Sequence, residues 1–352
     1  MYFDSRFIAY NDYDDEYHVR MKEEGNTGLV QAFAHLNYKL TNNLETNAGL
    51  HYQLFSLNNS YSVEPRLSLS YKLTQTTGIN LAYGLHSQVH PLLYYFYRYR
   101  EGDDWVARNK DLDFTKSNHF VVGINKSFTD DFFIKVDMFY QHLYDVPVSI
   151  ASGSEYYSFV NLGAEFAFDA EDSTVNNGFA RNYGVELTLN KAFSNGYYFL
   201  VTGTLFRSFY TDGAGIERSS AFDLGHILNV LGGVEFNLDD RNKYVLSADC
   251  KVSHIGGRRY IPYDIAASIE KGYGVRDIDN AYGAQWDDYF SFDIKIGFNI
   301  NLESTTHNFF IAVDNALNTQ NVVEYDWDSI KKEVDYEYQL GIFPYLGYRI
   351  NF

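Results

Sequence analysis

The chain has few of the residues that several common classes of protein require. Its 352 residues include one cysteine, Cys250, which excludes a disulfide framework and any metal site with several cysteine ligands. No apolar run approaches the roughly 18 residues of a membrane-spanning helix, so a membrane protein of this sequence has to be a closed barrel. The net charge of −18 argues against nucleic acid as a partner, because its phosphates would be repelled.

The first residues also lack the basic segment and apolar core of a secretory signal peptide. Two explanations fit this absence. The protein is cytosolic, or the chain begins partway through a longer one.

Aromatic residues are abundant, with 32 Tyr and 28 Phe, although the mean hydropathy of −0.32 is polar. The closing segment 346–352 shows how the two properties coexist. Its apolar side chains stand at every second position, and Gly347, Arg349 and Asn351 fall between them. Such a period of two indicates a strand with one apolar and one polar face, and a single strand of this kind fits a soluble sheet protein as well as a membrane barrel. The combination of many aromatic residues with a polar mean hydropathy suits a sheet with one apolar and one wet face better than a sandwich with a dry core.

The same alternation recurs along the chain from Gly28 onward. It predicts about thirteen or fourteen antiparallel strands, joined by tight turns at one end and long loops at the other, as in transmembrane barrels. Before Gly28 we expect one short strand, 6–10, followed by an acidic stretch. The predicted fold is therefore all-β, a transmembrane antiparallel barrel over residues 1–352. The expected long loops span residues 89–117, 144–181, 211–223, 255–286 and 316–340.

Several stretches resemble the barrel of TonB-dependent receptors. They include Glu24–Phe33 (EGNTGLVQAF), Asn182–Leu187 (NYGVEL) and Val313–Asn318 (VDNALN), in the same order along the chain as in that family. The ending resembles the sorting signal of outer-membrane barrels, carried here by Tyr348, Ile350 and Phe352.

The resemblance implies a 22-stranded outer-membrane barrel, of which this chain would supply roughly the last two-thirds. It further implies a plug domain, a TonB complex, the barrel assembly machinery and outer-membrane lipid as partners. The implied function is uptake of a scarce nutrient (a siderophore, vitamin or glycan) into the periplasm. The alternative is a smaller closed barrel of about fourteen strands that acts as a passive channel or surface binder. No feature resembles a hydrolase site, so no enzymatic activity is expected.

A pentad, Gly-Leu-His-x-Gln, occurs at 49–53 and again at 84–88, on the strands that flank Glu64 and Arg66. With a turn at about 57–60, Gln53 would lie opposite Glu64 and His51 opposite Arg66. One hypothesis is a lumen cluster that contacts a plug or substrate; the other is an ordinary polar barrel wall in which Glu and Arg pair. The predicted cluster consists of His51, Gln53, Glu64, Arg66, His86 and Gln88.

Neither a metal nor a cofactor is predicted. His86, His90 and His119 lie near one rim, but no carboxylate or cysteine completes a ligand set at suitable spacing. The long loops carry aromatic residues that either contact ligand or belong to the interfacial girdle. The ligand-contact candidates are Trp105, Tyr156, Tyr157, Tyr260, Trp286 and Trp327.

Overall fold

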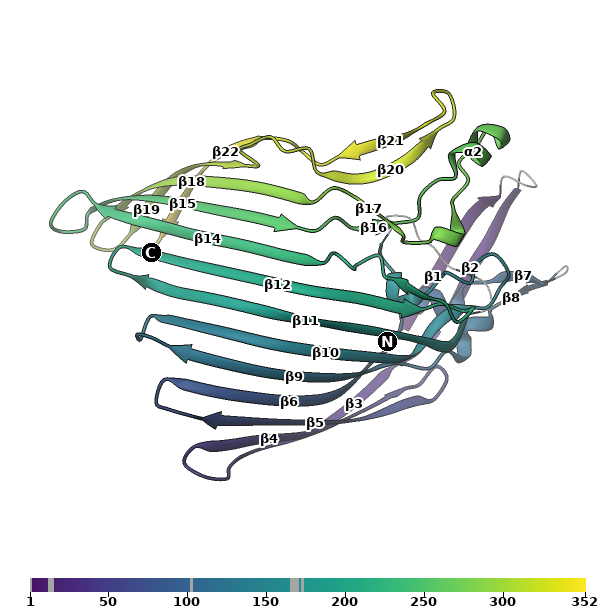
Figure 1. Cartoon of the computed structure of the whole chain (residues 1–352), viewed down its shortest axis with the longest axis horizontal. Coiled ribbons are helices and arrows are strands. Elements are labelled where there is room, and N and C mark those ends of the chain that lie inside the picture. The colour runs from purple at the N-terminus through teal and green to yellow at the C-terminus, as the bar shows by residue number, and fades with distance from the viewer. Residues whose placement is uncertain (1, 12–15, 102–103, 165–170, 172–173) are drawn as a thin grey trace.

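The computed structural model describes residues 2–11, 16–101, 104–164, 171 and 174–352, and these residues are mostly β-strand. One antiparallel sheet contains most of the strands, which follow each other across it in chain order (Figure 1). The strands along this path across the sheet are β3 (Leu29–Lys39), β4 (Leu44–Phe55), β5 (Ser60–Lys72), β6 (Thr77–Gln88), β9 (Thr115–Ser127), β10 (Phe132–Ser149), β11 (Thr174–Ser194), β12 (Tyr197–Thr211), β14 (His226–Asn237), β15 (Tyr244–Ile255), β18 (Tyr289–Asn301), β19 (Thr306–Asp314) and β22 (Phe343–Asn351). A short strand, β13 (Glu217–Ser219), pairs with β12 beside this path.

The sheet forms a curved wall that ends at β3 and at β22 (Figure 1). Among the described residues, no strand pairing joins these two edges. The all-β antiparallel fold is confirmed, and the wall leaves the backbone groups of two edge strands available for further pairing.

The alternation of the strands sorts side chains between the two faces of the wall. On β22, Tyr348 lies opposite Phe309 and Ile350 opposite His307, so both lie on the apolar outer face. Arg349 lies on the other face, and Phe352 follows the strand with 95% of its surface exposed. Large exposed apolar residues line the same outer face of the other strands, as expected where lipid replaces water.

Connections differ in length between the two ends of the wall, as predicted. Tight turns join the strands on the left of Figure 1, and the long connections gather on the right. The β4–β5 connection, residues 56–59, is the short one at the long-loop end. This asymmetry is typical of transmembrane barrels, whose long loops face outward.

The two largest differences from the prediction lie in the β10–β11 connection and in the segment before Gly28. The pairing of β10 with β11 continues past Leu143 through a bulge at Val146, so the connection covers residues 150–173 instead of 144–181. Asp145, whose φ is 55°, provides the left-handed residue at this bulge. The segment before Gly28 is a hairpin of β1 (Tyr2–Asn11) and β2 (Glu16–Asn26), where one short strand and an acidic stretch were expected.

The long connections have secondary structure of their own, which the sequence pattern did not predict. In α2, the Asp264 carboxylate accepts a hydrogen bond from Ala267 N, and Gly272 ends the helix with a φ of 77°. No helix among the described residues is long and apolar enough to cross a membrane. The connection elements are α1 (Leu92–Phe96), β7 (Tyr99–Glu101), β8 (Asp104–Val106), η1 (Arg108–Asp111), η2 (Phe159–Asn161), β13 (Glu217–Ser219), β16 (Arg259–Tyr260), α2 (Ile265–Lys271), η3 (Ile278–Asn280), β17 (Ala284–Gln285), β20 (Val322–Asp328) and β21 (Glu333–Tyr338).

The buried apolar residues lie mainly at the long-loop end. One cluster is centred on Tyr95 and Phe114 and joins the 89–114 connection to Phe55, Val146 and Phe159. A second cluster packs around Tyr210 and joins the 150–173, 212–225 and 256–288 connections. The loops therefore pack against each other as one layer with its own core, and do not extend separately into solvent.

Candidate functional site

The inner wall carries a hydrogen-bonded cluster centred on Glu64 of β5, which is 1% exposed. Its Oε1 accepts hydrogen bonds from Gln53 Nε2 at 2.6 Å and from both Ser87 Oγ and Ser87 N, at 2.6 and 3.1 Å. Its Oε2 accepts from Arg66 Nη2 at 2.8 Å and lies 3.0 Å from His51 Nδ1. Both carboxylate oxygens are therefore fully engaged within the wall.

The register within this cluster corrects the prediction. His51 lies opposite Glu64, Gln53 opposite Ser62, and Gly49 opposite Arg66. The turn begins and ends one residue earlier than expected, at 56–59, which shifts each pair by two residues. The cluster still forms because Gln53 reaches diagonally to Glu64.

The second pentad supplies a different residue from those predicted. Ser87, its variable position, makes the contacts to Glu64, whereas Gln88 is exposed. His86 faces His119 of β9, with ring centroids 4.6 Å apart. Nothing in the sequence distinguished Ser87, since strict alternation would place it on the outer face.

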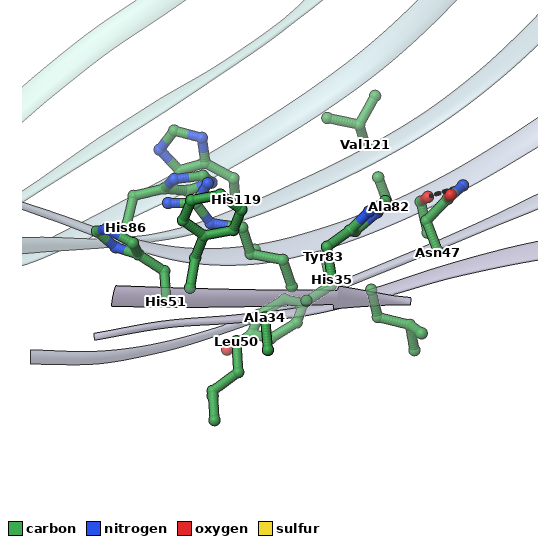
Figure 2. Close-up of a pocket in the computed structure, with 16 residues that line it drawn as sticks. Ala34, His35, Asn47, Leu50, His51, Ala82, Tyr83, His86, His119 and Val121 are labelled. Atoms are coloured by element: carbon green, nitrogen blue, oxygen red, sulfur yellow. Dashed lines mark hydrogen bonds between the residues drawn. The ribbon is translucent and has the colours of Figure 1, made fainter. Parts of the chain in front are cut away.

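A hollow of about 650 Å³ adjoins the cluster and is lined in part by Arg66, His51, His86 and His119. Figure 2 shows the imidazoles of His86 and His119 on one side of the strands and Leu50 on the other. Gly84 lies opposite Arg66, and a Cβ there would come within 2.6 Å of His86 Nε2. The absence of a side chain at Gly84 therefore leaves space for the His86 ring. The hollow presents imidazole and guanidinium groups to the lumen.

His90 turns away from the other histidines. It is 7% exposed, its Nε2 lies 3.0 Å from the backbone oxygen of Asp113, and its ring packs edge-on against Phe159. The suggested grouping of His86, His90 and His119 at one rim therefore does not form, because His90 belongs to the core of the loop layer.

Acidification should loosen the 89–114 connection through His90. Burial lowers the pKa of His90 from its ordinary 6.5 to about 4, so the unfolded loop binds a proton that the folded loop excludes. Stability is fully present above pH 6.5 and declines towards pH 4, by up to about 3 kcal/mol. Amide-exchange protection factors for this connection at pH 7 and pH 5 measure the loss. The His90→Gln variant should abolish the pH response, and an equal response in that variant would contradict the assignment to His90.

The predicted loop aromatics fall into two groups. Tyr157 is 5% exposed and packs in the first core cluster, and the backbone oxygen of Tyr156 accepts a hydrogen bond from Tyr210 at 2.7 Å. Trp105 lies on β8, and its side chain falls outside the described residues. Tyr156 and Tyr157 therefore anchor the loop layer, and their contact with a ligand stays a prediction.

Tyr260, Trp286 and Trp327 belong to one aromatic cluster with Tyr263 and Tyr325. The Tyr260 ring lies 4.6 Å from Tyr325 and 5.9 Å from Trp286, and Trp327 lies 6.1 Å from Tyr263. Trp327 is 7% exposed, whereas Tyr260 and Trp286 are half-buried. The sequence identified three of these aromatics. The cluster unites β16 with the residues that follow it, the residue directly after β17, and β20.

Two arginines, which the sequence did not single out, stack on this aromatic cluster. Arg258 Cζ lies 4.4 Å from the Trp286 ring centre, and Arg276 Cζ lies 4.5 and 4.6 Å from those of Tyr263 and Tyr325. The stacked guanidiniums place positive charge beside ring faces at the loop end of the wall.

An antiparallel wall with an apolar outer face, a polar inner face and long connections at one end defines the class of outer-membrane β-barrels. The family model described as "TonB dependent receptor-like, beta-barrel" matches residues 2–316. The chain therefore belongs to the TonB-dependent receptor-like β-barrel family. No curated protein matches the sequence.

Solved structures of such receptors share this fold at low sequence identity. The ferric yersiniabactin uptake receptor FyuA of Yersinia pestis is 16% identical, with a TM-score of 0.62 over 92% of this chain and 45% of its own. The ferric-catecholate import receptor Fiu of Escherichia coli is 14% identical, with a TM-score of 0.63 over 92% of this chain and 44% of its own. The ferric preacinetobactin receptor BauA of Acinetobacter baumannii is 12% identical, with a TM-score of 0.60 over 97% and 46%. The chain thus spans less than half the length of these receptors.

Proposed function

We propose that residues 1–352 form part of the barrel wall of an outer-membrane receptor that imports a scarce nutrient into the periplasm. The observation that carries this proposal is the family match over residues 2–316. A plug domain and a TonB complex would supply gating and energy, and the barrel assembly machinery would recognise Tyr348, Ile350 and Phe352. The two open sheet edges, β3 and β22, support further strands as their partners, because lipid leaves no other source of backbone hydrogen bonds.

The substrate we propose is an anionic chelate with aromatic or planar groups, of the siderophore class. The stacked Arg258 and the half-buried rings of Tyr260 and Trp286 offer charge and flat surface at the loop end. The hollow lined in part by Arg66, His51 and His86 presents guanidinium and imidazole groups on the inner wall. Several receptors of this fold are named for the ferric chelates they take up or bind, which supports the same class. Vitamins and glycans are the alternative substrates.

Uptake by cells that carry the full receptor tests this proposal. A ferric catecholate, cobalamin and an oligosaccharide serve as labelled probes, each with and without an uncoupler of the proton-motive force. We expect accumulation of the ferric chelate that stops on uncoupling. Accumulation that is unaffected by uncoupling would instead support a passive channel.

Within that assay, Tyr260→Ala should raise the half-saturating substrate concentration by about 3- to 10-fold, with the maximal rate unchanged, because one stacking surface is lost. Tyr273→Ala is the matched control, since Tyr273 lies in the same connection but is 58% exposed, outside the aromatic cluster. If Tyr260→Ala and Tyr273→Ala change the half-saturating concentration equally, the aromatic cluster does not bind substrate.

A further inference from the structure

Two histidines and an aspartate meet on the outer face of the wall, at its long-loop end. His226 opens β14, His254 lies near the end of β15 opposite Leu228, and Asp288 immediately precedes β18. His254 lies in one row with Leu228 and Phe290 of the apolar outer phase. His226 and Asp288 stand two residues before Leu228 and Phe290, so they continue this phase by one step towards the loops. They lie outside the lumen, so the inference does not depend on import.

The two distances from the Asp288 carboxylate to the imidazoles are close to those between ligands of one metal ion. Asp288 Oδ2 lies 3.2 Å from His254 Nε2 and 3.6 Å from His226 Nε2. Tetrahedral ligands at about 2.0–2.1 Å from zinc are separated from each other by roughly 3.3 Å. The candidate ligand atoms of all three residues lie within 4.8 Å of one another.

In this cluster one imidazole nitrogen lacks a hydrogen-bond partner, and a backbone N–H orients the carboxylate. His226 Nε2 is buried and has no hydrogen-bond partner among the described residues. A buried polar atom without a partner is destabilising, and a bond to a metal ion would satisfy it. Gly257 N donates to Asp288 Oδ1 at 3.2 Å, and this contact turns Oδ2 towards the two imidazoles.

We propose that His226, His254 and Asp288 bind a divalent transition metal, with Zn²⁺ the best match to two imidazoles and one carboxylate. Three protein ligands leave a fourth position for water or an anionic group from outside. The bound ion would tie β14, β15 and β18 together where the 212–225 and 256–288 connections leave the wall. The competing explanation is a hydrogen bond between Asp288 and one imidazole, without metal.

Zinc titration of the full receptor that contains this chain, purified in detergent and stripped with a chelator, tests the proposal. We expect one Zn²⁺ per chain by calorimetry and a zinc-dependent rise in the melting temperature. Each of His226→Ala, His254→Ala and Asp288→Asn should weaken binding by more than about 10-fold, because even outer-shell changes typically cost 10- to 100-fold. Asp288→Asn preserves the size of an exposed side chain, so it separates loss of binding from loss of folding.

Asp287→Asn is the matched control, because it removes the same charge one residue away, also at an exposed position. It should leave zinc affinity unchanged. Cobalt substitution gives a second readout: the Co²⁺-loaded chain should show a ligand-field spectrum that is absent from Asp288→Asn. Zinc affinity that is equal in the unmodified chain and in Asp288→Asn would overturn the metal site and leave only a hydrogen bond between histidine and aspartate.

Discussion

Replacing Glu64 with glutamine should lower the free energy of unfolding by about 2–4 kcal/mol, because the buried carboxylate loses its charge among donors that remain in place. Arg66 Nη2 and the Ser87 hydroxyl point at its two oxygens from opposite sides. The glutamine amide has one oxygen and one NH₂ group in place of two carboxylate oxygens. Its NH₂ group therefore faces either Arg66 or Ser87, and that contact becomes a donor facing a donor. Arg66 is 46% exposed, so water partly compensates its loss and keeps the cost below that of a fully buried pair.

Urea unfolding of the barrel refolded into lipid vesicles measures this loss. Glu45→Gln is the matched control, since Glu45 is on neighbouring β4 and accepts one hydrogen bond, from Asn37 at 2.7 Å. It should change the unfolding free energy by less than about 1 kcal/mol. If Glu64→Gln and Glu45→Gln lower the unfolding free energy equally, the contacts of Glu64 stabilise the wall no more than those of an ordinary surface carboxylate.

A double variant, Glu64→Gln with Arg66→Gln, separates a structural role from transport. The second substitution removes the Arg66 charge that Glu64→Gln leaves without a counter-charge, so the double variant should regain part of the stability lost in the single one. If the cluster contacts a plug or substrate, uptake falls in the double variant even where stability recovers. Unchanged uptake would assign the cluster to the wall alone.

The wall could be predicted from the sequence because one physical constraint acts on every strand. Lipid outside and water inside impose a period of two, and each strand repeats it independently. Leu346, Tyr348 and Ile350 show the effect, since their phase alone places them on the outer face. The end of the wall at which each loop lies could be predicted from the same repetition, because successive connections in an antiparallel sheet lie at alternate ends.

The cluster and the loop layer could not be predicted to the same depth. Register depends on where a turn begins, and a difference of one residue at Ser56 changed the partner of Glu64 from Gln53 to His51. Ser87 reaches Glu64 although strict alternation predicts the opposite face. In the loops no periodic environment exists, so Trp286 and Trp327 could be named but not placed together.

The Asp223 carboxylate forms a buried ion-pair network that could not be predicted from the sequence. Its side chain is fully buried, and it accepts hydrogen bonds from Arg207 Nε and Nη2, both at 3.0 Å. Arg259 Nε donates at 3.1 Å, Ser208 N at 2.9 Å and Ser219 Oγ at 2.9 Å. One carboxylate thus joins β12, β13 and β16, and the sequence contains no motif that marks it.

Asp223→Asn should therefore destabilise the loop layer by about 3 kcal/mol, because two guanidiniums lose a shared buried counter-charge. Amide-exchange protection should fall in residues 212–225 and 256–288 and remain unchanged in β9 and β10. Asp240→Asn, at an exposed position in a tight turn of the opposite end, is the control and should leave both connections protected. Equal protection in the two variants would show that the arginines find other partners.

The same carboxylate should make the loop layer acid-labile. Burial raises the pKa of Asp223, but the hydrogen bonds from Arg207, Ser208 and Ser219 outweigh it and hold the pKa below its usual range. A depressed pKa means that its contribution is fully present above the unfolded value of about 4 and is lost as pH falls through the folded value. Protection of residues 212–225 should therefore fall below pH 4 in the unmodified chain. Asp223→Asn should lack this fall, because it has already lost the charge that acid would neutralise.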